Sequence, residues 1–231
     1  MNILKASIVL IFIAHAVALE GQAPGGLPAT GDENILHALV RVGHAGGIPL
    51  GIIQPNDGTL CRTITGITPE RPSNAAEAIR QLALQAGYEV TQSGGTLVVR
   101  PRDVSGKLAT AMNYRFPQFP ADKGTMRSLG TTLDGWLAMT LGGVKAYASS
   151  DASSLEAKVL KLPGSASSTT MEIADRIVEL GPKGVWILSE DQNSNDKSWP
   201  IHMRTYSYED NVWSLDRLPC PMPLTKEPKK K

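Results

Sequence analysis

The sequence predicts an α+β fold made of two small sheet-and-helix domains. Amphipathic helical stretches alternate with short apolar runs of strand length along the chain. A Ser93-Gly94-Gly95 turn between two apolar runs indicates a β-hairpin. The segment Arg100-Pro-Arg-Asp103 separates a first domain, 32–103, from a second one, 104–218.

The first residues are typical of a secretory signal peptide. Lys5 precedes an apolar run from Ala6 to Ala14, and an A-x-A cleavage site ends at Ala18. The run is shorter than the roughly 20 apolar residues that span a bilayer. We therefore expect residues 1–18 to be removed, with an uncleaved anchor helix as the alternative, and residues 19–31 to form a Gly/Pro/Ala linker. The mature chain is predicted to be periplasmic or secreted.

Charge and hydropathy exclude some classes of partner. The chain has 23 basic and 22 acidic residues, and removal of the signal region takes away one basic residue, Lys5. A neutral mature chain argues against nucleic acid or an anionic membrane as the main partner. No later stretch is apolar and long enough to be an integral membrane segment. Residues 219–231 form a Pro/Lys-rich tail that we expect to be a solubilising end.

The first domain is predicted to run α-β-β-α-β-β. Asp32 is expected to cap the first helix, Ser73 or Asn74 the second, and Gly87 to end the second. The expected elements are a helix from Glu33 to Val42, strands Ile48–Ile53 and Arg62–Ile67, a helix from Ala75 to Ala86, and a hairpin with strands at Tyr88–Val90 and Leu97–Val99.

This first domain resembles a known family. The matching runs are Ile35–Val42 with Gly46-Gly47-Ile48, Thr63–Gly66, Ala75–Leu82 with Ala86-Gly87-Tyr88, and Thr96–Val99. Over residues of about 32–102 the chain is similar to the short N-terminal (STN) domain of secretins and TonB-dependent receptors. The shared motifs are packing patterns. No secretin core or TonB-dependent barrel follows them, so the resemblance implies a protein-binding module rather than a pore or transporter.

The second domain is expected to hold further helices and strands. They are a short helix at Val104–Met112, an extended run at Phe116–Pro120, a helix at Thr125–Met139, strands at Val144–Ala148 and Ala157–Leu162, a helix at Met171–Leu180 capped by Thr169 or Thr170, a strand at Val185–Leu188, and a hairpin at Ile201–Tyr208 and Val212–Leu215. The order strand, helix, glycine, strand occurs at 62–90 and again at 158–188. A diverged internal repeat is one hypothesis, and convergence of short αβ units is the other.

The two cysteines are Cys61 and Cys220. In an exported chain they can form a disulfide, and the alternative is two unpaired thiols. A bridge would close nearly the whole mature chain. No C-x-x-C pair supports thioredoxin-like redox chemistry or a zinc site.

Other candidate residues give weaker signals. Asp191, Asn193 and Asn195 have the odd-position spacing of a calcium loop, but Asp196 and His202 stand where Gly and Glu belong, so a plain hairpin loop fits better. His37 and His44 lack a nearby cysteine or carboxylate at metal-ligand spacing. Trp199, beside this polar loop, is the best candidate for an exposed binding aromatic.

No set of residues indicates a reaction. The residues of the first domain are explained by packing and turns, and we expect no catalytic residue, cofactor or metal. The predicted function is an exported, non-catalytic protein-interaction module with an envelope protein as partner, binding by strand addition or helix docking. The alternative is an envelope enzyme, or a glycan or small-ligand binder, with its site between the two halves.

Overall fold

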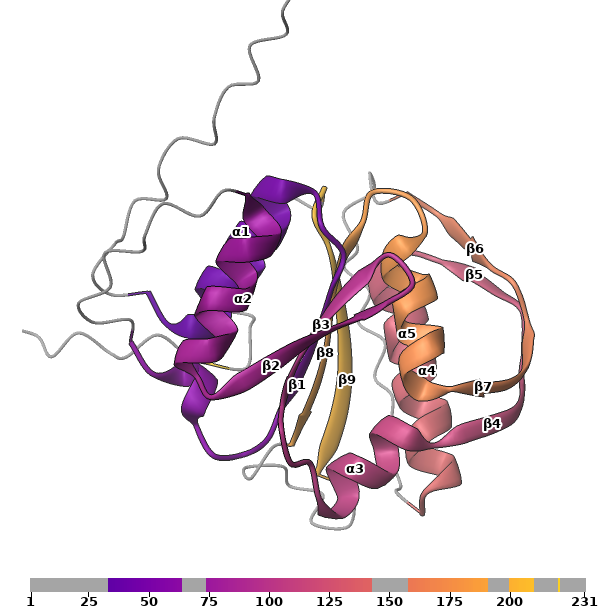
Figure 1. Ribbon diagram of the computed structural model, residues 1–231. Helices are drawn as coiled ribbons and strands as arrows, with labels where there is room; N and C mark the ends of the chain where they lie inside the picture. Colours follow the sequence, from indigo (N-terminus) through magenta and orange to yellow (C-terminus); the bar gives the residue numbers. More distant parts are fainter. Residues whose placement is uncertain (1–32, 64–73, 143–157, 191–199, 210–219, 221–231) are drawn as a thin grey trace, which may run out of the picture.

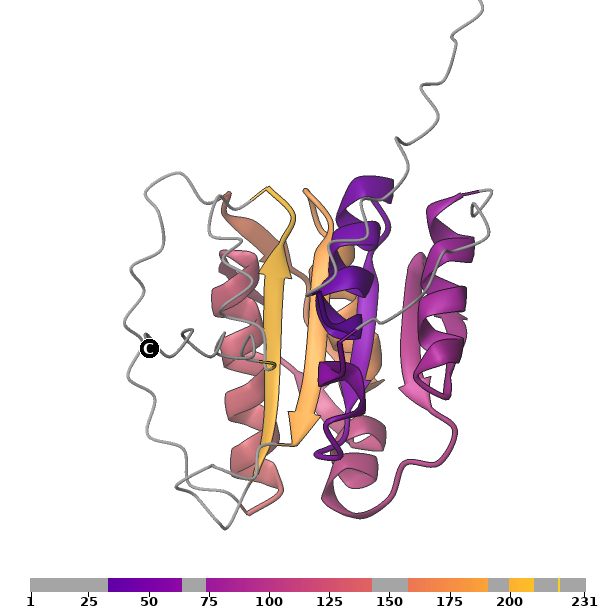
Figure 2. The ribbon, with the colours of Figure 1, turned by 90° about the vertical axis from the view of Figure 1, so that its left-hand side faces the viewer.

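The computed structural model describes residues 33–63, 74–142, 158–190, 200–209 and 220, in which a central sheet lies between two layers of helices (Figure 1). The sheet has the strand order β2-β3-β1-β8-β9. Its strands are β1 (Leu50–Gln54), β2 (Tyr88–Ser93), β3 (Thr96–Pro101), β8 (Gly184–Glu190) and β9 (Ile201–Ser207). Helices α1 (Ile35–Gly46) and α2 (Ala75–Gln85) cover one face (Figure 2). Helices α3 (Gly106–Asn113), α4 (Met126–Thr140) and α5 (Thr170–Glu179) cover the other.

Four short strands pair outside this sheet. β4 (Arg115–Phe119) pairs with β7 (Ser165–Thr169), and β5 (Asp122–Gly124) pairs with β6 (Leu160–Leu162). A short 3₁₀ helix, η1 (Thr59–Cys61), follows β1. Both small sheets are antiparallel, and they lie beside α4 and α5 on the right of Figure 1.

The α+β class is confirmed, but the expected division into two sheets, one in 32–103 and one in 104–218, is corrected. Strand β1 pairs in parallel with β3 of its own half and with β8 of the other half. The register sets Leu50 opposite Val185 and Gln54 opposite Ser189. Because β8 is almost wholly buried, it needs a neighbour on each side and a helix layer on each face, and an internal position in the sheet supplies them.

Strand β8 divides its side chains between two hydrophobic cores. Val185 and Ile187 point into the core under α1 and α2, and Trp186 and Leu188 point into the core under α3, α4 and α5. Gly51 on β1 makes room for Trp186, because a Cβ at Gly51 would collide with the indole ring.

The helix starts follow the capping chemistry in the sequence. Asn34, rather than Asp32, caps α1, and its side chain accepts a hydrogen bond from the His37 N–H at 2.9 Å. Asn74, one of the two predicted candidates, caps α2. Thr169 caps α5, and Glu172 completes a capping box by accepting a hydrogen bond from the Thr169 N–H at 2.7 Å.

The strand predicted at Ile201–Tyr208 corresponds to β9, for which the structure shows β8 as the partner. Strand β9 pairs with β8, with Glu190 opposite Ile201, so residues 191–200 connect the two strands. The expected strand at Val212–Leu215 lies outside the described residues, as do the one at Val144–Ala148 and most of Arg62–Ile67. Of that last run, Thr63 forms a single bridge with Asn34.

The topology gives no support to an internal repeat. In the first unit, α2 leads into β2 at the margin of the sheet, whereas in the second unit α5 leads into β8 in its interior. The two helices also cover opposite faces of the sheet (Figure 1). Two units that share an element order therefore occupy unrelated positions.

Candidate functional site

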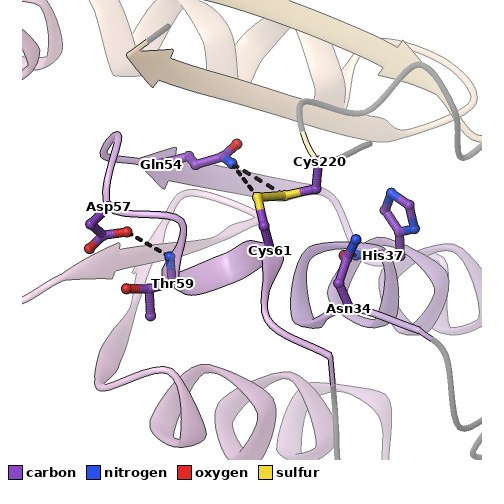
Figure 3. The surroundings of a disulfide bond; sticks show 7 residues. All are labelled: Asn34, His37, Gln54, Asp57, Thr59, Cys61 and Cys220. Atoms are coloured by element: carbon purple, nitrogen blue, oxygen red, sulfur yellow. Dashed lines mark hydrogen bonds between the residues drawn. A yellow bond between two sulfur atoms is a disulfide. The ribbon is translucent and has the colours of Figure 1, made fainter. Parts of the chain in front are cut away.

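The two cysteines form a disulfide in the structure (Figure 3). Cys61 lies at the end of η1, its Cα is 5.2 Å from that of Cys220, and the bridge spans 159 positions of sequence. Gln54, at the end of β1, directs its amide nitrogen at both sulfurs, at 3.5 Å from Cys61 Sγ and 3.4 Å from Cys220 Sγ. Because Cys220 is fully buried, this bridge has the surroundings of a structural disulfide.

Neither histidine considered in the sequence forms a metal cluster. His37 is buried in α1 behind the Asn34 cap, while His44 lies exposed at the end of α1 with its ring 5.4 Å from that of Tyr208. Within the described ranges, no group of three or more His, Cys, Asp or Glu side chains could hold a metal ion. In the same residues, no helix has both the length and the apolar character to cross a membrane.

Two carboxylates on α5 meet the tip of the β2–β3 hairpin, where the two halves of the chain join. Glu179 Oε1 accepts hydrogen bonds from the Gly95 N–H at 2.8 Å and from the Thr96 hydroxyl at 2.9 Å. One turn earlier, buried Asp175 accepts a hydrogen bond from the Trp186 indole N–H at 2.7 Å. Each carboxylate thus holds a protein donor, and together they fasten the hairpin and strand β8 to α5.

Burial changes the acidity of one of these groups. Desolvation raises the pKa of Asp175 to about 6, hydrogen bonding with Ser93 and Trp186 opposes that rise, and the charges of Glu179 and Glu172 add to it. This cluster was not predicted from the sequence. The available signal was Asp175 itself, a charged residue that lies four residues after Met171 and three before Val178 and so borders the apolar face of α5.

Strand β2 is the terminal strand of the sheet, and among the described residues it pairs with β3 alone. Its six residues pair without a bulge, from Ser93 opposite Thr96 to Tyr88 opposite Pro101. Its only charged residue, Glu89, is engaged with the neighbouring strand, because Arg100 Nη2 lies 2.7 Å from Glu89 Oε1. Proline, lysine and bulges are the usual protections of a sheet edge, and β2 has none of them.

The hydrogen bonding of β3 identifies which groups of β2 point outward. The Leu97 N–H donates to the Pro49 carbonyl at 3.0 Å, on the β1 side, so Leu97 does not bond Gln92, the residue opposite it. Alternate residues of an antiparallel strand direct their N–H and C=O groups to the same side. Tyr88, Val90 and Gln92 therefore present their backbone groups away from β3.

Helix α2 adds an apolar side chain beside this edge. Ala75 faces α1, since a Cβ on Gly46 of α1 would collide with the Ala75 methyl. Leu84 is nine residues further on, which is about half a turn around the helix axis. It lies on the flank of α2 that is remote from α1 and is 67% exposed. Val90, half-buried on the same face of the sheet, extends this apolar margin.

The remaining sequence candidates lie outside the described residues. These are Trp199 and the loop residues Asp191, Asn193 and Asn195. The edge of β2 is therefore the candidate site that the described residues support best.

Comparison with protein-family models, with curated proteins and with solved structures finds no match to this chain.

Proposed function

We propose that the protein is an exported, non-catalytic protein-interaction module that binds an envelope protein by strand addition at β2. The observation that carries this proposal is the regular, unprotected edge, with the backbone groups of Tyr88, Val90 and Gln92 directed outward. An extended segment that pairs with such an edge gains main-chain hydrogen bonds, and alternate side-chain contacts give it specificity. A regular strand edge with outward-pointing backbone groups is a more specific indication of a binding site than an exposed surface alone.

Two further parts of the proposal have their own support. A buried disulfide supports export through the signal peptide predicted at 1–18, since disulfides persist in oxidising compartments. The order of α1, β1, α2 and the β2–β3 hairpin supports an STN-like character for residues of about 32–102. By contrast, Asp175 and Glu179 are both engaged by protein donors, so the junction between the halves offers less support for an enzyme or a glycan-binding site.

The test is an affinity pull-down from envelope extract with the disulfide-bonded chain and two matched variants. Gln92→Pro removes one outward N–H while leaving the β2–β3 hydrogen bonds, and proline is tolerated at an edge strand. Gln92→Thr is the control, because it changes the same exposed side chain but keeps the N–H.

We expect the unmodified chain and Gln92→Thr to retain the same protein partner and Gln92→Pro to lose it. Equal retention by all three proteins would exclude β2 as the binding edge. Recovery of no protein, together with saturable binding of a sugar or small molecule, would contradict the proposed function.

A further inference from the structure

We infer that the strand received by β2 is the same strand of a second copy of this chain, so that two molecules join their sheets across a two-fold axis. The inference rests on the proposed role of β2 as a binding edge and names its partner. Homo-oligomers with one two-fold axis are the commonest assemblies, and they require a surface that is complementary to itself. Strand β2 meets this requirement in its backbone, its charges and its apolar margin.

The backbone selects one register. In a two-fold antiparallel pair, some residue of β2 must lie opposite its own copy. If that residue is Val90, then Tyr88 lies opposite Gln92 of the second copy, and all three outward-pointing residues form hydrogen-bonded pairs. Centring the pair on Thr91 instead would leave Tyr88 opposite the Gly94 turn. The Val90-centred register therefore uses the whole edge.

The charges of the edge are compatible with this register. Glu89 lies opposite the uncharged, exposed Thr91 of the second copy, so no like charges face each other across the axis. Glu89 is also already paired with Arg100. The flank of α2 above the edge carries the exposed ion pair of Arg80 with Glu77, at 3.9 Å, which adds no net charge.

The apolar margin is complementary to itself as well. Val90 lies opposite its own copy on the face of the sheet that α1 and α2 cover. Adjacent strands are about 4.8 Å apart, so two strand spacings match the distance of about 8–10 Å between packed helices. Because α2 packs above β2 and β3, pairing of the two edges would bring the two α2 helices side by side. Each exposed Leu84 would then be covered by the other molecule.

Thr91 provides a test that does not disturb the fold, because its side chain is exposed. Thr91→Glu puts a carboxylate directly opposite Glu89 of the second copy, whereas Thr91→Lys puts an ammonium group there. The molar mass in solution of the full disulfide-bonded chain and both variants would be measured by sedimentation over a dilution series. Circular dichroism would verify that all three proteins are folded.

We expect the unmodified chain to dimerise, Thr91→Glu to weaken the dimer roughly tenfold in Kd through its two symmetric contacts, and Thr91→Lys to tighten it. Weakening by both variants would overturn the Val90-centred register, since it would indicate Thr91 opposite itself. A dimer indifferent to both variants, or a monomer at every concentration, would overturn the inference. A monomer that still loses its envelope partner through Gln92→Pro would leave the proposed function intact, whereas a monomer without such a partner would end both proposals.

Discussion

Strands β8 and β2 show how two strands that each follow an amphipathic helix take different positions in one sheet. Each follows an amphipathic helix of comparable length, α5 with 10 residues and α2 with 11. Strand β8 is apolar through consecutive positions and is buried on both faces between β1 and β9. Strand β2 has exposed polar residues at Thr91 and Gln92, and it ends the sheet. The continuous apolar run makes β8 part of the core, while the polar half of β2 keeps its edge accessible.

The largest difference between these strands is expected when a side chain of β8 is removed. Trp186→Ala deletes a fully buried indole and leaves the Asp175 carboxylate without its 2.7 Å donor. Large-to-small changes of this kind cost about 3–5 kcal/mol of unfolding free energy. Urea denaturation would measure this cost, with Gln92→Ala on β2 as the control, for which we expect a change within about 0.5 kcal/mol. A loss below about 1 kcal/mol for Trp186→Ala would show that β8 is not the centre of the core.

The second effect concerns Asp175, which packs against β8. Its pKa is raised to about 6 from an ordinary value of 3.8, so between these pH values the folded state binds more protons than the unfolded state. The contribution of Asp175 to the free energy of unfolding therefore falls as the pH rises from about 4 to about 6, and it no longer changes above that range. Asp175→Asn keeps an oxygen for the Trp186 N–H but removes the buried charge.

We expect Asp175→Asn to raise the unfolding free energy at pH 7.5 by up to about 3 kcal/mol and to flatten its decline between pH 4 and 6. Thermal unfolding across this pH range would measure both changes. Asp103→Asn, at an exposed position outside α5, is the matched control for removing one acidic charge. A steeper decline in Asp175→Asn than in the unmodified chain would contradict the assignment.

The smallest effect is expected at Tyr88, where β2 begins. Its ring is buried, and its hydroxyl oxygen is buried without a hydrogen-bond partner in the part of the chain that the structure describes. Burial raises the pKa of this phenol, with the Asp57 charge as the lesser cause. Tyr88→Phe removes the unsatisfied group and keeps the ring, so we expect a gain of about 1 kcal/mol in urea denaturation. A loss above about 1 kcal/mol would indicate that the hydroxyl is satisfied in solution.

The sequence was sufficient to locate most elements, because their signals are local. The Gly94-Gly95 turn specifies the β2–β3 hairpin, and Asn74 and Thr169 specify the starts of α2 and α5. It was not sufficient to join the two halves, since the pairing of β1 with β8 depends on contacts between residues more than 130 positions apart. For this reason the expectation of a separate sheet in each half was wrong. The carboxylate cluster of Asp175 and Glu179 was not predicted for the same reason, because Glu179 contacts a hairpin 83 positions away.

Amide hydrogen exchange, followed residue by residue, tests most directly whether β2 is an open edge used for binding. At concentrations below association, the outward amides of Tyr88, Val90 and Gln92 should exchange fast, and the inward amides of Glu89 and Ser93 slowly. Above association, Tyr88, Val90 and Gln92 should become protected in the unmodified chain but much less so in Thr91→Glu. Slow exchange of Val90 and Gln92 in the dilute protein, equal to that of Glu89, would show that the edge is already covered and would contradict the proposed binding role.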